Sequence, residues 1–185
     1  MEIEIGAEAK DKRLNSAVAM TVVALSVFMG LAGVKDGNIV QAMQQAQSDA
    51  VDTWGEYQAT RTKLHIDETA LAQLRLLSGG QTPAGLAEQA RLTAEIAKYA
   101  KEAPELKAKA QGFSAQYDAL NVHDDQFDAS DALISIAISI AAVAALVESN
   151  FALVAAWLFG AAGAVMGMAG FLGLALHSPL AQLLS

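Results

Sequence analysis

The last third of the chain is an apolar block from Ala132 to Leu176 that contains one charged residue, Glu148. The short polar segment 148–150 divides this block into two apolar runs, residues 132–147 and residues 151–176. Because bilayer hydrocarbon is about 30 Å thick, a helix that spans it needs roughly 17–25 residues, most of them apolar. The block therefore predicts two transmembrane helices, one short and one long, joined by a tight turn.

A third apolar run, residues 14–34, follows the basic residues Lys10, Lys12 and Arg13 and contains no charged residue. A basic flank before an apolar run also resembles a secretory signal peptide, but an h-region has only about 7–15 residues. Leu31-Ala32-Gly33 is moreover a poor cleavage site. We therefore expect residues 14–34 to be retained as the first transmembrane helix, after a short N-terminal tail of residues 1–13.

The basic residues near the first span predict the orientation in the membrane. Three of them precede residues 14–34, whereas only Lys35 follows directly. Because basic residues near the ends of a span favour the cytoplasmic side, we expect a cytoplasmic N-terminus and a middle segment in the periplasm. Three spans then place the 148–150 turn in the cytoplasm and the C-terminal tail, residues 177–185, outside.

The middle segment, residues 35–131, is charged and polar. It holds 9 of the 12 basic and 15 of the 20 acidic residues, so its net charge is −6. This acidic balance argues against nucleic-acid binding, which needs a basic surface. The absence of cysteine excludes disulfides and thiol nucleophiles.

The middle segment shows two helical patterns around one turn. Between Asn38 and Leu77 there is no proline, and apolar residues recur mostly three, four or seven positions apart: Ile39, Met43, Ala46, Ala50, Trp54, Tyr57, Leu64, Leu71 and Leu74. Gly79 and Gly80 can end this helix, and Thr82 as N-cap with Pro83 at the first position can begin the next. We expect an antiparallel hairpin with its apex near residues 79–83.

The second arm of this hairpin runs to about Leu120, and we expect Pro104 to kink or divide it. An apex near residues 80–81 predicts one register for the two arms. That register pairs opposite charges across the arms, namely Asp52 with Lys109, Glu56 with Lys107, Arg61 with Glu102, and Glu68 with Arg91.

Acidic residues gather just before the second span, where Asp124, Asp128 and Asp131 share one helix face beside His123. Oxygen ligands on one face could hold a hard divalent cation, which makes His123, Asp124 and Asp128 weak metal candidates. The favoured interpretation is an acidic collar at the membrane boundary, placed by the hairpin register opposite Lys35. We therefore expect no metal, and the absence of a phosphate loop, HExxH or GxSxG motif predicts no catalytic residue and no cofactor.

Two further sets of residues are candidates for packing or for partner contact. Trp54, Tyr57 and Met43 could pack between the hairpin arms or meet a partner. The third span carries glycines three or four residues apart, and small residues let helices approach closely in lipid; with one glycine of the first span the set is Gly160, Gly163, Gly167, Gly170, Gly173 and Gly30. Either self-association or packing among the three spans would use them.

The order of these parts resembles a known family. The junction after the first span, the aromatic segment and the approach to the second span carry the resemblance: Gly33-Val34-Lys35-Asp36-Gly37-Asn38, Trp54-Gly55-Glu56-Tyr57-Gln58-Ala59, and His123…Phe127 leading into Leu133-Ile134-Ser135-Ile136-Ala137-Ile138. Over nearly its whole length the chain is similar to the uncharacterised bacterial inner-membrane proteins of domain-of-unknown-function family 4337. This resemblance implies a bacterial inner-membrane protein and transfers no catalytic residue.

The sequence thus predicts an all-α membrane protein with three transmembrane helices and a long extramembrane antiparallel helical hairpin between the first and second. We expect a non-catalytic structural or accessory subunit that contacts the lipid bilayer and either copies of itself or other membrane-complex subunits. An oligomeric channel or transport component is the alternative, and a metal-dependent membrane enzyme or sensor is a weaker one.

Overall fold

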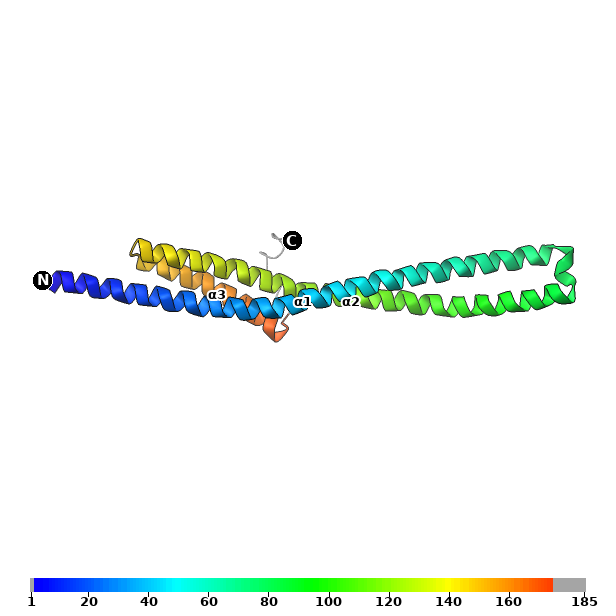
Figure 1. The fold of residues 1–185 in the computed structure, drawn as a ribbon, viewed down its shortest axis with the longest axis horizontal. Helices are drawn as coiled ribbons and strands as arrows, with labels where there is room; N and C mark the ends of the chain where they lie inside the picture. Colours follow the sequence, from blue (N-terminus) through cyan, green and yellow to red (C-terminus); the bar gives the residue numbers. More distant parts are fainter. Residues whose placement is uncertain (1, 175–185) are drawn as a thin grey trace. The chain divides into compact units, whose positions relative to one another are not determined.

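The computed structural model describes residues 2–174, with side chains described from residue 12 onward, and the part it describes is helical without strands. The elements are α1 (Glu2–Leu76), the short 3-10 helix η1 (Ser78–Gln81), α2 (Pro83–Leu146) and α3 (Asn150–Leu172) (Figure 1). Three helices are long and apolar enough to cross a membrane. The predicted all-α class is confirmed for the described residues. The predicted tail 177–185 and the last two residues of the third span lie outside them.

Contacts divide the chain into two compact units. The three-helix unit combines α1 up to residue 42, α2 from residue 119, and α3. The hairpin unit is residues 43–118 and contains the second half of α1, η1 and the first part of α2. Both long helices therefore contribute to both units.

The turn of the hairpin unit is capped as the sequence predicts. The Thr82 side-chain oxygen accepts a hydrogen bond from the Gly85 amide at 3.1 Å, and α2 begins at Pro83. The same hydroxyl donates to the Gly79 carbonyl oxygen at 2.7 Å. Because an N-cap side chain satisfies one of the free amides of the first turn, this residue fixes where α2 begins.

Two glycines make the turn sterically possible. A Cβ at Gly80 would collide with the carbonyl oxygen of Leu74, and one at Gly85 would collide with the carbonyl oxygens of Gly79 and Gly80. A Cβ at Gly79, in contrast, would meet nothing within 4 Å. The chain can therefore fold back so tightly only because the residue facing each of these carbonyls has no side chain.

The hairpin arms pair through apolar side chains and one cation–π contact. The buried apolar residues are Met43, Ala46, Ala50, Leu64 and Leu71 from α1, and Leu92, Ala103 and Ala110 from α2. Lys63 Nζ lies 5.9 Å from the centroid of the Tyr99 ring on the opposite arm. The helical stripe seen in the sequence is thus the contact line between the arms.

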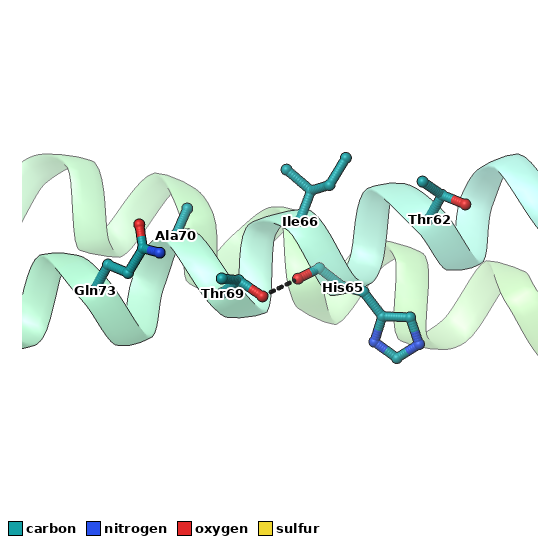
Figure 2. A pocket seen from close by; sticks show the side chains of 6 residues that line it. All are labelled: Thr62, His65, Ile66, Thr69, Ala70 and Gln73. Carbon is teal, nitrogen blue, oxygen red and sulfur yellow. Dashed lines mark hydrogen bonds between the residues drawn. The ribbon is translucent and has the colours of Figure 1, made fainter.

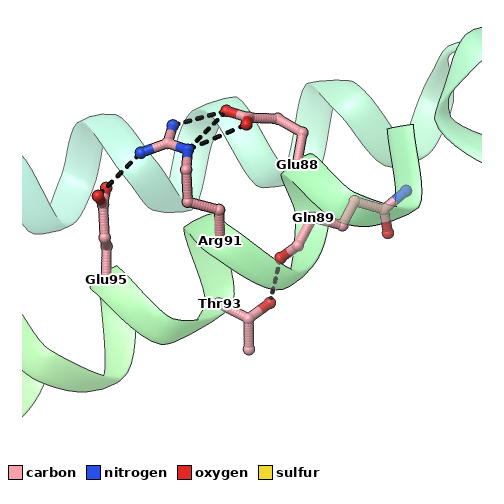
Figure 3. Close-up of polar contacts among 5 residues, drawn as sticks. All are labelled: Glu88, Gln89, Arg91, Thr93 and Glu95. Carbon is pink, nitrogen blue, oxygen red and sulfur yellow. Dashed lines mark hydrogen bonds and ion pairs between the residues drawn. The ribbon is translucent and has the colours of Figure 1, made fainter. Parts of the chain in front are cut away.

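The predicted ion pairs between the arms are wrong. Arg91 binds Glu88 at 2.6 Å and Glu95 at 2.8 Å on its own helix (Figure 3), and Glu68 lies 3.1 Å from His65 on α1. In the described part of the chain, the ion pairs within 4.0 Å all join residues three or four apart on one helix. Exposed charges find such local partners at little entropic cost.

Pro104 does not divide α2, so that part of the prediction is wrong. The helix continues through it from Pro83 to Leu146. Pro104 is exposed, and the neighbouring Ala103 is 4% exposed. The proline ring therefore remains open to solvent beside the contact between the arms, so water can satisfy the carbonyl that loses its donor, while the burial of Ala103 holds the helix in place.

In the three-helix unit, α3 follows a short turn after α2. Glu148 in this turn has a φ of 52°, and Ser149 caps α3 by accepting from the Ala152 amide at 3.3 Å. Gly173 ends α3 in the left-handed region, with a φ of 67°. Glycine adopts this conformation without a steric penalty, which explains its position here.

The glycine face of α3 packs against α1 and α2 of the same chain. Gly160, Gly163, Gly167 and Gly170 are buried. A Cβ at Gly163 would lie 2.8 Å from Ile134 Cγ1 and 3.0 Å from the Ser130 carbonyl oxygen, both on α2. One at Gly167 would lie 2.8 Å from the Phe28 ring on α1. These glycines therefore allow α3 to approach both neighbours closely.

Replacing Gly163 by alanine should destabilise the three-helix unit by about 1–3 kcal/mol, because the added methyl group meets a backbone oxygen and rigid parts of two side chains. The matched control is Gly30→Ala on α1, where a Cβ meets nothing within 4 Å. Thermal unfolding in detergent micelles, followed by circular dichroism, measures both variants. Equal midpoints for the two variants would contradict this account of the packing.

Candidate functional site

Five carboxyl groups lie together in the three-helix unit and form what we call the acidic cluster. Asp36 comes from α1, and Asp124, Asp125, Asp128 and Asp131 come from α2. Asp124, Asp128 and Asp131 are three and four residues apart, which places them on one side of the helix. The cluster confirms the predicted concentration of acid on this face.

Asp36 takes the place that the sequence analysis gave to Lys35. The side chain of Asp36 contacts that of Asp124, whereas Lys35 is exposed and forms no ion pair with the residues that the structure describes. Neighbouring residues on a helix point about 100° apart, so only one of the two can face α2. The prediction of a lysine opposite the collar is therefore wrong, and the collar faces a further carboxyl group.

Asp36 and Asp124 are placed to share a proton. One oxygen of Asp36, Oδ1, is buried and has no hydrogen-bond donor. An ionised carboxylate only accepts hydrogen bonds, so two carboxyl groups bind one another only when one of them is protonated. A single proton on Asp124 would supply the donor that Asp36 lacks.

The electrostatics of the cluster favour this proton. Burial, followed by the negative charges of Asp36 and Asp128, raises the pKa of Asp124 to about 6. Burial and the charge of Asp128 also raise the pKa of Asp36, and burial together with Asp125 raises the pKa of Asp128. In the described residues, no lysine or arginine lies within 4.0 Å of these carboxyl groups to oppose the shifts.

The weak metal candidates are not gathered into a ligand set. In the part of the chain that the structure describes, no three His, Cys, Asp or Glu side chains are placed to hold a metal ion. His123 instead has its Nδ1 atom 3.3 Å from Oε1 of Gln126. His123 therefore has a partner on its own helix.

Gln126 is a site residue that the sequence analysis missed. Its side chain is 1% exposed, and its amide nitrogen donates to the Leu174 carbonyl oxygen, just beyond α3, at 2.6 Å. A carbonyl at a helix end has no intrahelical donor, so this bond ties the end of α3 to α2. Nearby, Phe127 packs edge-to-face on Phe171 with ring centroids 5.3 Å apart. A lone glutamine among aspartates was the only signal in the sequence.

The aromatic candidates of the hairpin unit line the space between its arms. Trp54 and Tyr57 pack edge-to-face, with ring centroids 5.5 Å apart. Trp54 lines a groove with Tyr117 of α2, and Tyr57 lines another with Pro104. Met43 is buried. These positions fit packing between the arms, and contact with a partner stays a prediction.

The glycine candidates differ in their surroundings. The four buried glycines of α3 contact α1 and α2, as described above, whereas a Cβ at Gly30 or Gly173 would meet nothing within 4 Å. Helix packing within the chain thus accounts for four of the six candidates, and their use in self-association stays untested.

A protein-family model matches residues 14–173 of the chain. The matching model is described as a domain of unknown function, DUF4337. This match confirms the resemblance drawn from the junction after the first span and from the aromatic segment. No curated protein and no solved structure matches the chain.

Asp124→Asn should weaken the dependence of the free energy of unfolding on pH. The folded chain raises the pKa of Asp124 from 3.8 to about 6, so it binds this proton more tightly than the unfolded chain does. The resulting stability is complete below pH 3.8 and is lost as the pH rises through 6. With allowance for solvent screening of a half-buried group, we expect a loss of about 1 kcal/mol.

Thermal unfolding midpoints measured at about pH 4.5 and about pH 7.5 test whether stability falls as the pH rises. The variant should match the wild type at the lower pH and exceed it at the higher pH. Asp52→Asn, an exposed position outside the acidic cluster, serves as the matched control. If the wild-type midpoint instead rose from the lower to the higher pH, relative to the midpoint of Asp124→Asn, the raised pKa of Asp124 would be refuted.

Proposed function

The chain belongs to the DUF4337 family, and from this premise we propose that it is a non-catalytic membrane protein that acts as a structural or accessory subunit. In this proposal it crosses a bacterial inner membrane three times and associates with copies of itself through the hairpin unit. Three helices of sufficient length and apolarity support the membrane part. The excess of basic residues before the first span supports a cytoplasmic N-terminus and a periplasmic hairpin.

One surface of the hairpin unit carries the proposal of self-association. Figure 2 shows side chains along α1 that surround a shallow hollow of about 510 Å³; they are Thr62, His65, Ile66, Thr69, Ala70 and Gln73, which we call the outer face of α1. Ile66 is 60% exposed at its centre. Lysine, arginine, aspartate and glutamate are absent from this face, although the hairpin unit is otherwise rich in charge.

The polar groups of the outer face are mostly satisfied within α1. Thr62 donates its hydroxyl to the Gln58 carbonyl oxygen at 2.9 Å, and Thr69 donates to the His65 carbonyl oxygen at 2.7 Å. The His65 ring lies within 3.1 Å of both Arg61 and Glu68. A neighbour that covers this face would therefore bury methyl groups and Ile66 without leaving hydroxyl groups unpaired.

A second copy suits this surface because it presents the same chemistry. Two copies anchored in one membrane with the same topology would carry their outer faces at the same height. An interface of this kind is isologous and would bring Ile66 of one copy against Ile66 of the other. The glycine face of α3 supports this choice indirectly, because its four buried glycines are occupied by α1 and α2 of the same chain.

Ile66→Lys should weaken association at least about tenfold, because each copy loses the burial of an isoleucine and gains a like charge at the contact. Native mass spectrometry of the full chain in mild detergent measures the effect. The control is Leu86→Lys, which places the same charge at a position 52% exposed on α2. A wild-type chain that is monomeric in this measurement, or equal effects of the two variants, would refute the proposal.

A further inference from the structure

A second groove of the hairpin unit lies between its two arms. It has a volume of about 350 Å³ and is lined by Gln47, Ala50, Val51 and Trp54 from α1 and by Ser114, Tyr117 and Asp118 from α2. Small-molecule sites begin at about 300 Å³ and are lined mainly by apolar and aromatic side chains with a few polar groups. The groove has this size and this composition.

Three polar side chains of the groove have unused hydrogen-bonding capacity. The Gln47 amide, the Tyr117 hydroxyl and the Asp118 carboxyl group form no hydrogen bond or ion pair with the residues that the structure describes. Ser114, in contrast, donates to the Ala110 carbonyl oxygen at 3.2 Å. A carboxylate and two aromatic rings that line one groove make a set of groups suited to a positive charge.

The surrounding charges favour a cation. Residues 43–58 and 110–118, the stretches of α1 and α2 that contain the groove, carry four acidic residues and no lysine or arginine: Asp49, Asp52, Glu56 and Asp118. Lys109 is the nearest lysine along α2, and its Nζ atom lies 5.8 Å from the centroid of the Phe113 ring. That contact gives Lys109 an aromatic partner of its own.

We propose that this groove binds a small organic cation with an alkylated ammonium head, held by Trp54 and Tyr117 and neutralised by Asp118. The electron-rich faces of aromatic rings attract a cation, and most strongly where water is displaced. Ala50 and Val51 offer apolar contact to the methyl groups of such a head. The groove lies within one hairpin, so this proposal is independent of whether the chain self-associates.

Trp54 can report the binding directly. The chain has two tryptophans, so Trp157→Phe leaves Trp54 as the sole indole of the full-length protein. In that background, choline should change the Trp54 fluorescence in a saturable way at constant ionic strength. Its uncharged isostere 3,3-dimethylbutan-1-ol should produce no saturable change, because the attraction depends on the charge.

Two groove variants and one control complete the experiment. Asp118→Asn and Tyr117→Leu should each weaken choline binding about threefold or more, and Glu105→Gln, an exposed position of α2 outside the acidic stretches around the groove, should leave it unchanged. Circular dichroism checks that each variant keeps its helix content. Absence of saturation with choline, equal binding of the isostere, or equal effects of Asp118→Asn and Glu105→Gln would overturn the proposal.

Discussion

The close approach of α3 to α1 and α2 is the contact on which the three-helix unit depends. Gly163 and Gly170 lie where a side chain would meet Ile134 and Phe127. Small residues are buried on α2 as well: Ala137, Ala141 and Ala144 are fully buried. In the same unit, α1 and α2 bring the carboxyl groups of Asp36 and Asp124 together. Burial and the neighbouring negative charges raise the pKa of Asp124, which favours a proton there.

The sequence predicts the parts of this fold that depend on local or periodic signals. The turn before Pro83 is fixed by residues within one helical turn, and the buried stripe of α1 follows the helical period. Contacts between residues that are distant in the sequence cannot be predicted from such signals. Nothing local in the sequence marks the steric need at Gly85 or the bond from Gln126 to the end of α3. The predicted ion pairs between the arms are absent, and Glu68 and Arg91 bind partners on their own helix instead. The register itself fits the contact of Lys63 with Tyr99 across the arms.

The acidic cluster shows that a shift of one residue along a helix changes which side chain faces the neighbouring helix. Lys35 and Asp36 are adjacent in the sequence, but only one of them can face α2. Which of the two does so decides whether Asp124 meets a cation or a carboxyl group. In the hairpin unit, charge is likewise distributed unevenly: the outer face of α1 contains no lysine, arginine, aspartate or glutamate, while the groove lined by Trp54 also contains Asp118. We propose that self-association uses the first surface and that cation binding uses the second.

The most direct test of the proposed architecture is the labelling of single cysteines in spheroplasts with a membrane-impermeant maleimide. The chain has no cysteine of its own, so Gln81→Cys at the apex of the hairpin and Asn150→Cys at the start of α3 each introduce one thiol. Both positions are exposed. We predict that Gln81→Cys reacts in intact spheroplasts and that Asn150→Cys reacts only after lysis. Labelling of both variants, or of neither, before lysis would contradict a chain that crosses the membrane between these two positions.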